Sequence, residues 1–413
     1  MRWPPYLDPL RGRNFRRLYI GQTVSVFGDG LTPVAITFAV LGLTGSATDL
    51  GLVLAAQSLP LAALSLAGGV WGDRLRREWM MMISDLIRAA AQGMVAMLLL
   101  SHSAHIWQLA LLFAIYGAAE AFFRPAAGAL IPQIVQADHL QEANALMGIS
   151  ENFGWMVGPA VAGILVAFIG PGGAIAIDAA TFLVSAGFLA VLRAPPLERT
   201  RQPETFAREL RDGWREVWSR TWLWTMMLRT GLVLFIVIAP FQVLGPLALR
   251  QHGHGAEAWG LITGLFSAGM LLGGAMALRY KPRRPMVTVC YTGLTALLAP
   301  FVVGMGGGVE ALAVAMVLRG VAIGVLVTIW NTTLQREIPD EALARVTAWD
   351  WMTSLALWPI GLAIAGPVAE AVGVTNACWL SFFVGTAGAI WALFVKDVWR
   401  LQSPAAEPAA KKA

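Results

Sequence analysis

Long apolar segments separated by short turns run through the whole chain. Two stretches, residues 89–119 and 230–249, contain no Asp, Glu, Lys or Arg at all. Because an α-helix rises ~1.5 Å per residue and ~20 residues cross a bilayer core, segments of this length predict membrane-spanning helices. Twelve are predicted, at residues 16–43, 50–70, 80–100, 107–123, 144–169, 174–192, 223–249, 259–278, 286–303, 311–330, 347–369 and 375–395.

The composition strengthens this interpretation. The 413 residues are 57% hydrophobic and only 13% charged, about half of the ~25% charged share of soluble domains. So few charged and so many hydrophobic residues exclude a soluble domain and a disordered chain. A disulfide scaffold is excluded because there are only two cysteines, Cys290 and Cys378, and both lie in apolar stretches. The basic residues 1–17 lead directly into the first apolar segment without a small-residue cleavage pattern, so we expect that segment to be retained as a helix.

The positions of the charges predict the topology. Most of the 30 Lys and Arg residues fall in alternate loops, and the intervening loops 42–48, 101–106, 170–173 and 304–308 contain none. Basic loops stay on the cytoplasmic side. We therefore expect a multi-pass protein of a bacterial-type cytoplasmic (inner) membrane with both termini in the cytoplasm. The net charge of +5 then reflects topology, and no nucleic-acid partner is expected.

Three dipeptides recur in the same order, 205 to 208 residues further along the chain. Internal repeats are typical of transporter folds. We expect a six-helix bundle at 1–193, a cytoplasmic linker at 194–221, a second six-helix bundle at 222–396 and a cytoplasmic tail at 397–413. The pairs are Gly68-Gly69 with Gly273-Gly274, Ile131-Pro132 with Ile338-Pro339, and Gly158-Pro159 with Gly366-Pro367.

The linker carries apolar residues at helical spacing with charged residues between them. This pattern predicts an amphipathic helix. Its tryptophans favour contact with the membrane surface, and a solvated linker helix is the alternative. The apolar positions are Phe206, Leu210, Trp214, Val217 and Trp218.

Three motifs stand out along the first half of the chain. The first is the loop Gly69-Val-Trp-Gly72-Asp73-Arg74-Leu-Arg76-Arg77, and the second is Gly154-Trp-Met-Val-Gly158-Pro159-Ala-Val-Ala-Gly163. The first resembles the signature loop of the major facilitator superfamily, and the second resembles the antiporter motif of that family. A third stretch, Phe123-Arg124-Pro125-Ala126 onward to Ala143-Asn144-Ala145, resembles the subgroup of macrolide, multidrug and enterobactin exporters. The arginine that many antiporters carry in the middle of the fourth helix is absent, and Leu112 and Phe113 occupy that region.

The resemblance implies an all-α fold of twelve transmembrane helices in two pseudo-symmetric six-helix bundles, and residues for gating and packing. We expect Asp73 to latch the cytoplasmic side by pairing with a helix N-terminus or a basic residue, and the small residues to allow close helix packing. The gating residues are Gly69, Gly72, Asp73, Arg74 and Arg77, and the antiporter motif residues are Gly154, Gly158, Pro159 and Gly163.

Three carboxylates are candidates for proton coupling: Asp29, Glu120 and Glu151. Charged groups inside a bilayer are costly and usually functional. Asp29 lies deep in the first helix between two glycines and has no basic residue within one turn, so it is the first candidate for a group that binds and releases a proton. Alternatively, it pairs with an arginine of another helix, such as Arg229 or Arg319.

Several other charged residues have a structural explanation. Glu120 can pair with Arg124 at i, i+4, and Asp85 with Arg88 at i, i+3. We interpret the pair on the third helix as structural. Two further acids, Asp178 and Asp350, are weaker candidates for coupling because helix partners or helix ends could hold them.

A central cavity would suit aromatic, methionine and amide side chains, which tolerate varied ligands. For any one of them, a lipid-facing position is the simpler explanation. The candidates are Met227, Phe235, Gln242, Trp330, Asn331 and Trp358. The five histidines all fall in loops without metal-ligand spacing, and no phosphate-binding loop is present, so we expect neither a metal, nor a cofactor, nor ATP as the energy source.

The sequence therefore predicts a secondary active transporter and no enzymatic activity. We expect it to act as a monomer in the lipid bilayer, exporting small amphiphilic compounds, cations among them, in exchange for protons by alternating access. The resemblance to macrolide, multidrug and enterobactin exporters implies drugs and siderophore-like metabolites as the classes of substrate. The alternatives are a proton-coupled or uncoupled transporter of a nutrient or lipid and, from another class, a multi-pass membrane enzyme, for which no cluster of His, Asp or Ser is evident.

Overall fold

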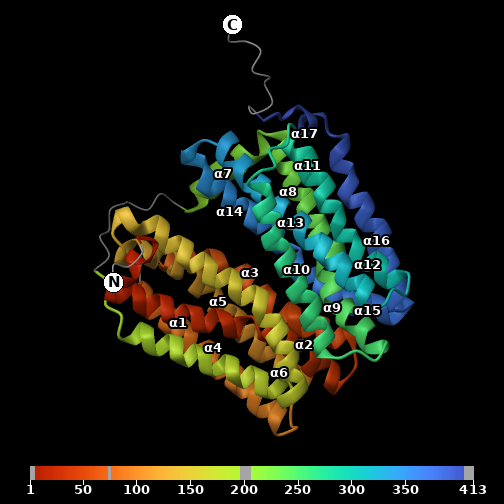
Figure 1. Ribbon diagram of the computed structural model, residues 1–413. Helices are drawn as coiled ribbons and strands as arrows, with labels where there is room; N and C mark the ends of the chain where they lie inside the picture. Colours follow the sequence, from red (N-terminus) through yellow and green to blue (C-terminus); the bar gives the residue numbers. More distant parts are fainter. Residues whose placement is uncertain (1–4, 73–75, 196–205, 404–413) are drawn as a thin grey trace. The chain divides into compact units, whose positions relative to one another are not determined.

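A computed structural model describes residues 5–72, 76–195 and 206–403, and all regular secondary structure within these ranges is helical (Figure 1). Eleven helices there are long and apolar enough to cross a membrane. One of them, residues Ala137–Ala190, has 54 residues and is broken at Gly170, whose φ of 73° and ψ of 168° are not helical. Counting its two parts separately gives the twelve predicted spans. Helices suit a bilayer because their backbone N–H and C=O groups form hydrogen bonds with one another, and the bilayer core has no water to bind them instead.

By its contacts the chain divides into two compact units, which are described in turn. The first comprises residues 1–200 with 249–264, and the second 201–248 with 265–413. In the first unit α3 packs against α5, α1 against α6, and α4 against both α5 and α6. Its long helices are α1 (Arg13–Asp29), α2 (Thr32–Leu43), α3 (Ala47–Gly72), α4 (Arg77–Leu100), α5 (Ile106–Ile134) and α6 (Leu140–Ala190), with short 3₁₀ turns at Pro5–Arg11 and Ala137–His139.

In the second unit α11 packs against α13, α12 against α16, and α8 against α16. Helix α10, whose first residues belong to the first unit, lies on α13 from Leu265 onward. The helices are α7 (Phe206–Trp218), α8 (Thr221–Val233), α9 (Ala239–Gln251), α10 (Ala256–Ala277), α11 (Pro285–Gly293), α12 (Leu298–Gly304), α13 (Val309–Glu337), α14 (Asp340–Ala356), α15 (Trp358–Val372), α16 (Val374–Ile390) and α17 (Lys396–Arg400). Leu234–Ile238 is π-helical, and Leu294–Leu297 and Trp391–Phe394 are 3₁₀ turns.

The first predicted helix is broken in the middle. Helix α1 ends at Asp29, and α2 begins at Thr32 with Pro33 in its first turn. Proline suits the first turn of a helix because its missing N–H has no intrahelical partner there. The break leaves Asp29 as the last residue of α1, so that its side chain lies where one helix gives way to the next.

The amphipathic helix of the linker is α7, and it packs against α14. Gly213 lies so close that an added Cβ would come within 3.0 Å of side-chain atoms of both Arg345 and Trp349. Val217 is buried, whereas Trp214 and Trp218 are 44% and 59% exposed. The side chains of Phe206 and Leu210 lie outside the described part of the chain. Thus one face of α7 packs against α14 and another face exposes indole rings.

Candidate functional site

The first unit holds a carboxylate at the break between α1 and α2. The Tyr116 hydroxyl of α5 donates a hydrogen bond of 2.7 Å to Asp29 Oδ1, and Arg88 Nη1 of α4 lies 3.8 Å from the same oxygen. The Asp29 side chain is 23% exposed and that of Arg88 only 2%. A half-buried acid is therefore held by a phenol and a buried arginine from two other helices.

Arg88 has a second and closer carboxylate partner, Asp85, one turn earlier on α4. Asp85 is fully buried and also accepts a 2.6 Å hydrogen bond from Ser185 of α6. Ser185 in turn accepts a bond of 3.0 Å from Gln22 of α1. Because a buried charge needs a partner of opposite sign, the Asp85–Arg88 pair is a fixed element that joins α4 to α6 and α1.

Aromatic rings surround the Arg88 guanidinium. Its central carbon lies 4.2 Å from the Phe123 ring centroid, 4.3 Å from that of Phe182 and 5.9 Å from that of Tyr116. A cation above a ring face is attracted by the ring quadrupole, more strongly when water is excluded. The rings thus help to stabilise the positive charge of Arg88 between the helices of the first unit. They also limit the positions that its guanidinium group can take.

A third carboxylate, Asp178 of α6, is fully buried and held by neutral donors. Its Oδ2 accepts hydrogen bonds from the Thr32 hydroxyl at 2.7 Å and from the Gln92 amide at 3.2 Å. Thr32 is the first residue of α2, so this bond fixes the start of α2 just beyond Asp29. Asp29 and Asp178 therefore act on the two sides of the break.

Glycines allow α1 and α6 to approach closely around this network. An added Cβ on Gly28 would collide with Thr181 Oγ1 and lie 2.5 Å from Asp178 Oδ1. On Gly158 it would lie 2.7 Å from the Gly30 Cα. Gly154 similarly faces Val26. The close helix packing that the antiporter motif predicts is thus a contact with the broken helix that carries Asp29.

The rest of that motif contacts the start of α10, within the same unit. An added Cβ on Gly163 would lie 2.7 Å from the Ala256 carbonyl oxygen, and one on Gly260 would collide with the carbonyl of Pro159. Glu151, expected to lie above this row of glycines, is exposed at the surface of α6 and belongs to none of the bonds of the network.

The second coupling candidate, Glu120, forms the predicted ion pair with Arg124. The closest Arg124 nitrogen lies 2.5 Å from Glu120 Oε1, and the Arg124 and Glu120 side chains are 55% and 11% exposed, respectively. This pair lies one helical turn along α5 from Tyr116, which bonds Asp29. Glu120 is therefore close in sequence to the network and is already partnered.

The gating motif is described only at its two ends. Gly69 and Gly72 belong to the last turn of α3, whereas Asp73 and Arg74 lie outside the described residues. Arg77 is the first residue of α4, and its Nη1 donates a 2.5 Å hydrogen bond to the Ala129 carbonyl of α5. One motif arginine thus binds the end of a neighbouring helix.

The residues predicted to line a cavity have different environments in the structure. Met227 is 2% exposed and packs in the hydrophobic core of the second unit with Met226 and Cys290, and its place on a cavity stays a prediction. Trp330 donates a 2.9 Å hydrogen bond to Asp350 Oδ2. Gln242 and Asn331 are exposed, whereas Phe235 and Trp358 are partly buried.

The alternative that Asp29 pairs with Arg229 or Arg319 is also wrong, because its arginine is Arg88. Arg229 donates instead to the carbonyls of Ala389 and Cys290, each at 2.9 Å. The Arg319 guanidinium carbon lies 5.0 Å from the Phe266 ring centroid. Both arginines are buried in the second unit.

Sequence reasoning undervalued Arg88, Tyr116 and Asp178. A signal was present on α4, where Asp85, Arg88 and Gln92 recur at i, i+3 and i+7 and so share one face of a helix. Arg88 is also about eleven residues past the start of the helix, which at ~1.5 Å per residue places it ~17 Å along the axis. That depth argues against a pair at the membrane surface.

The helices and the buried charge network define a multi-pass membrane protein of two six-helix halves. A family model of the Major Facilitator Superfamily matches residues 18–361. The chain belongs to this superfamily, whose members are transporters, and the predicted fold class is confirmed.

Similar proteins include exporters. The multidrug efflux pump Tap of Mycolicibacterium fortuitum is 29% identical over 363 residues, covering 84% of this chain and 87% of that protein. Macrolide efflux protein A of Streptococcus pyogenes is 26% identical over 375 residues, covering 89% and 92%. Among solved structures, the nucleoside transporter NupG matches with a TM-score of 0.74 at 14% identity, covering 94% of this chain and 99% of that one. At that identity the likeness concerns the fold alone.

Proposed function

We propose that this protein exports small amphiphilic compounds, drugs or siderophore-like metabolites, in exchange for protons by alternating access. The similarity to a multidrug pump and a macrolide efflux protein over more than four fifths of the chain supports the direction and the class of substrate. The buried charge network supports the coupling to protons, because ionisable groups in membrane helices are costly and mark ion or proton pathways.

The observation that carries the coupling is the difference between Asp29 and the other carboxylates around it. Asp85 and Asp178 are fully buried, whereas the Asp29 side chain is 23% exposed. Asp29 also makes the longer contact with Arg88, at 3.8 Å. It is therefore the most exposed of these three carboxylates and the one that can leave its partner without stranding a fully buried charge.

Protonation of Asp29 would act on the break between α1 and α2. An ionised Asp29 attracts Arg88 and accepts the Tyr116 hydrogen bond, which holds the end of α1 against α4 and α5. A proton removes the charge and weakens the attraction to Arg88. Asp178 keeps its hold on Thr32 at the start of α2. The proton thus changes one side of the break while the other stays fixed.

A cationic substrate would compete with the proton for this carboxylate. Binding of one then opposes binding of the other, and this reciprocity links substrate release to proton uptake. Glu120 is the second coupling residue in this proposal, through its pair with Arg124. Glu151, exposed on α6, is the next to examine if neither carries the proton.

The same proposal includes a topology and an assembly. The protein lies as a monomer in a bacterial cytoplasmic membrane with both termini in the cytoplasm, because the basic loops alternate as retained loops do. Asp73 latches the cytoplasmic side of a first bundle at 1–193, and a linker at 194–221 leads to a second bundle at 222–396 and a tail at 397–413.

Transport into proteoliposomes under an imposed pH gradient tests the coupling. Asp29→Asn should abolish gradient-driven transport of both cationic and neutral compounds while leaving binding of neutral compounds intact. Glu120→Gln should give a partial loss that is greatest for cations. The matched control is Asp49→Asn, which removes a carboxylate from the first turn of α3 in the same unit and should transport like the wild type.

Full pH-driven transport by Asp29→Asn would show that this carboxylate is structural and that coupling lies elsewhere. A panel that includes nucleosides, peptides and lipids alongside drugs separates export of amphiphiles from transport of a nutrient or lipid. Chemical conversion of any panel member by the purified protein would favour a membrane enzyme instead.

A further inference from the structure

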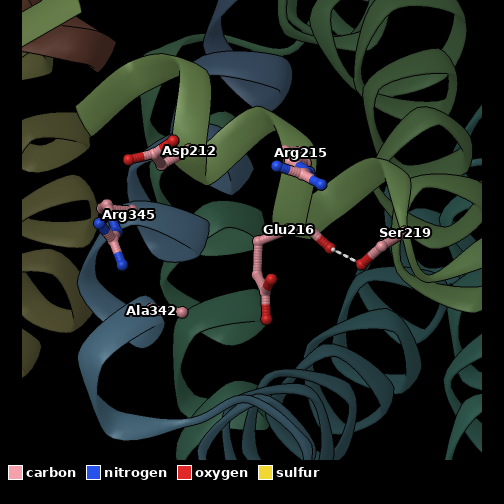
Figure 2. A pocket seen from close by; sticks show the side chains of 6 residues that line it. All are labelled: Asp212, Arg215, Glu216, Ser219, Ala342 and Arg345. Atoms are coloured by element: carbon pink, nitrogen blue, oxygen red, sulfur yellow. Dashed lines mark hydrogen bonds between the residues drawn. The ribbon is translucent and has the colours of Figure 1, made fainter. Parts of the chain in front are cut away.

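A pocket with charged walls lies where two spans of the second unit begin. Its volume is about 350 Å³, which is in the range of small ligand sites. Figure 2 shows Asp212, Arg215, Glu216 and Ser219 along α7 and the turn after it, with Ala342 and Arg345 of α14 across from them. Ser219 shortly precedes the span Thr221–Gln251, and Ala342 lies at the start of the span Glu341–Val372. The pocket is therefore at the level of a membrane surface.

Tryptophans beside the pocket indicate the same level. The Trp214 ring stacks on Trp218 with centroids 5.4 Å apart and lies 4.7 Å from Trp349, and Trp218 stacks on Trp224 at 5.4 Å. Tryptophan is enriched at membrane interfaces, where its ring sits among the headgroups. Trp214 and Trp218 are largely exposed. Helix α7 thus presents indoles to the layer that contains lipid headgroups.

Among the residues that the structure describes, the charges of the pocket are not all compensated by a partner. Glu216 forms a 2.6 Å ion pair with Arg220. Arg345 donates through Nη2 to the Glu341 carbonyl at 3.0 Å, while its buried Nε has no hydrogen-bond partner among the described residues. Arg215 and Asp212 are exposed on α7 and line the same pocket. The Glu216–Arg220 pair is neutral, so within the described part of the chain the guanidinium groups of Arg215 and Arg345 and the carboxylate of Asp212 are available to bind a ligand.

We propose that this pocket binds the headgroup of a phospholipid that carries both a phosphodiester and a primary ammonium, as phosphatidylethanolamine does. Arg215 and Arg345 bind the phosphate, since guanidinium groups form strong, directional bonds to phosphate oxygens. Asp212 accepts an N–H bond from the ammonium. The lipid would join α7 to α14 at the membrane surface. This binding requires only that the chain is in a membrane and does not depend on the proposed proton exchange.

The test uses the full-length protein in detergent micelles and measures lipid binding by native mass spectrometry. The probes are three phospholipids with identical acyl chains. Phosphatidylethanolamine has a primary ammonium, phosphatidylcholine has a quaternary ammonium without an N–H, and phosphatidylglycerol has no cation. The wild type should bind phosphatidylethanolamine about fivefold more tightly than phosphatidylcholine, because a charge-assisted hydrogen bond is lost in the latter.

Each of the three charged residues proposed to bind the headgroup is substituted in turn. Arg215→Gln and Arg345→Gln should each weaken binding of all three lipids by about fivefold. Asp212→Asn should remove the preference for phosphatidylethanolamine and leave phosphatidylglycerol binding unchanged or tighter. Arg215 is exposed, so its variant remains informative if Arg345→Gln disturbs the contact with Gly213. The matched control is Arg211→Gln, which removes the same charge from an exposed position of α7 that does not line the pocket and should bind like the wild type.

Two results would overturn the proposal. An equal loss in Arg211→Gln and Arg215→Gln would mean that lipids respond to the overall charge of α7 and that the pocket is not a site. Displacement of bound lipid by millimolar inorganic phosphate or by glycerophosphoethanolamine at equal potency would assign the arginines to a free phosphate. Persistence of the lipid against inorganic phosphate, with displacement only by glycerophosphoethanolamine, supports the headgroup site.

Discussion

Replacing Arg88 by Met separates a structural carboxylate from a functional one, because Arg88 contacts both Asp85 and Asp29. The Arg88 and Asp85 side chains are 2% and 0% exposed. Removing one partner of a buried ion pair typically costs about 3–5 kcal/mol, since the other charge is left without compensation. We therefore expect Arg88→Met to lower the free energy of unfolding by about that amount.

Second substitutions then reveal which carboxylate was stranded. In Arg88→Met, Asp85→Asn the buried charge is gone, so at least half of the lost stability should return. In Arg88→Met, Asp29→Asn much less should return, because the Asp29 side chain is 23% exposed and keeps the Tyr116 hydrogen bond without Arg88. A control is Arg124→Met, whose side chain is 55% exposed and whose loss should cost below about 1 kcal/mol.

The assay is unfolding of the purified variants in detergent micelles, by denaturant titration or by heat, followed through tryptophan fluorescence. Equal recovery from the two double variants would refute the reasoning, since Asp29 would then be as much a structural partner of Arg88 as Asp85 is. The proton-coupling role of Asp29 would lose its physical basis in that case.

Three further predictions concern packing, gating and topology. Gly158→Ala should destabilise the protein by about 1–3 kcal/mol because its Cβ would meet the backbone of Gly30, whereas Gly148→Ala on the same helix meets nothing within 4 Å and should stabilise it by up to about 1 kcal/mol; unfolding in micelles compares them. Asp73→Asn should shift the populations of open and closed states up to about tenfold, if a helix-end contact of ~1–2 kcal/mol is lost; identical spin-label distances across the cytoplasmic face in variant and wild type would contradict this. Cysteine at Ser101 should react with an impermeant reagent from outside intact cells, and cysteine at Lys281 only after permeabilisation; labelling of position 281 from outside would contradict the twelve-span topology.

The number and type of helices could be predicted from the sequence because the bilayer imposes a local requirement. Each span must be apolar for ~20 residues and satisfy its own backbone, whatever its neighbours are. The two halves of α6 illustrate this, since segments 144–169 and 174–192 were separable by the turn at Gly170 even though the helix is otherwise continuous. The break after Asp29 was harder to predict, because residues 16–43 as a whole have the length and hydropathy of a single span, and a proline near the middle of a span does not by itself end it.

The partners within the candidate site could not be predicted because they depend on how helices are rotated against one another. Asp29 was identified from its depth and its glycine neighbours, properties of one helix. Its contacts with Tyr116 and Arg88 require α4 and α5 to turn particular faces toward α1, which a single helix pattern does not determine. For the same reason Met227 resembles a cavity residue in sequence and packs in the core in the structure.

One backbone contact occurs once in each half, and the residues beside it differ. Gly117 in α5 and Gly320 in α13 occupy the same position in helices of 29 residues, and an added Cβ on either would collide with a backbone carbonyl oxygen, of α3 in the first case and of α10 in the second. The residue before the first glycine is Tyr116, which bonds Asp29. The residue before the second is Arg319, which lies over a phenylalanine ring.

The repeated glycine therefore shows that the two halves share one backbone contact but differ in the residues beside it. Both halves are built on one duplicated helix crossing, yet under the proposed coupling only the first contains the ionisable machinery. Substitutions that alter substrate preference could then accumulate in the second half without disturbing energy conversion in the first. In such an arrangement, substitutions in the second half change which compounds are exported, while the first half keeps the residues of the proposed proton coupling.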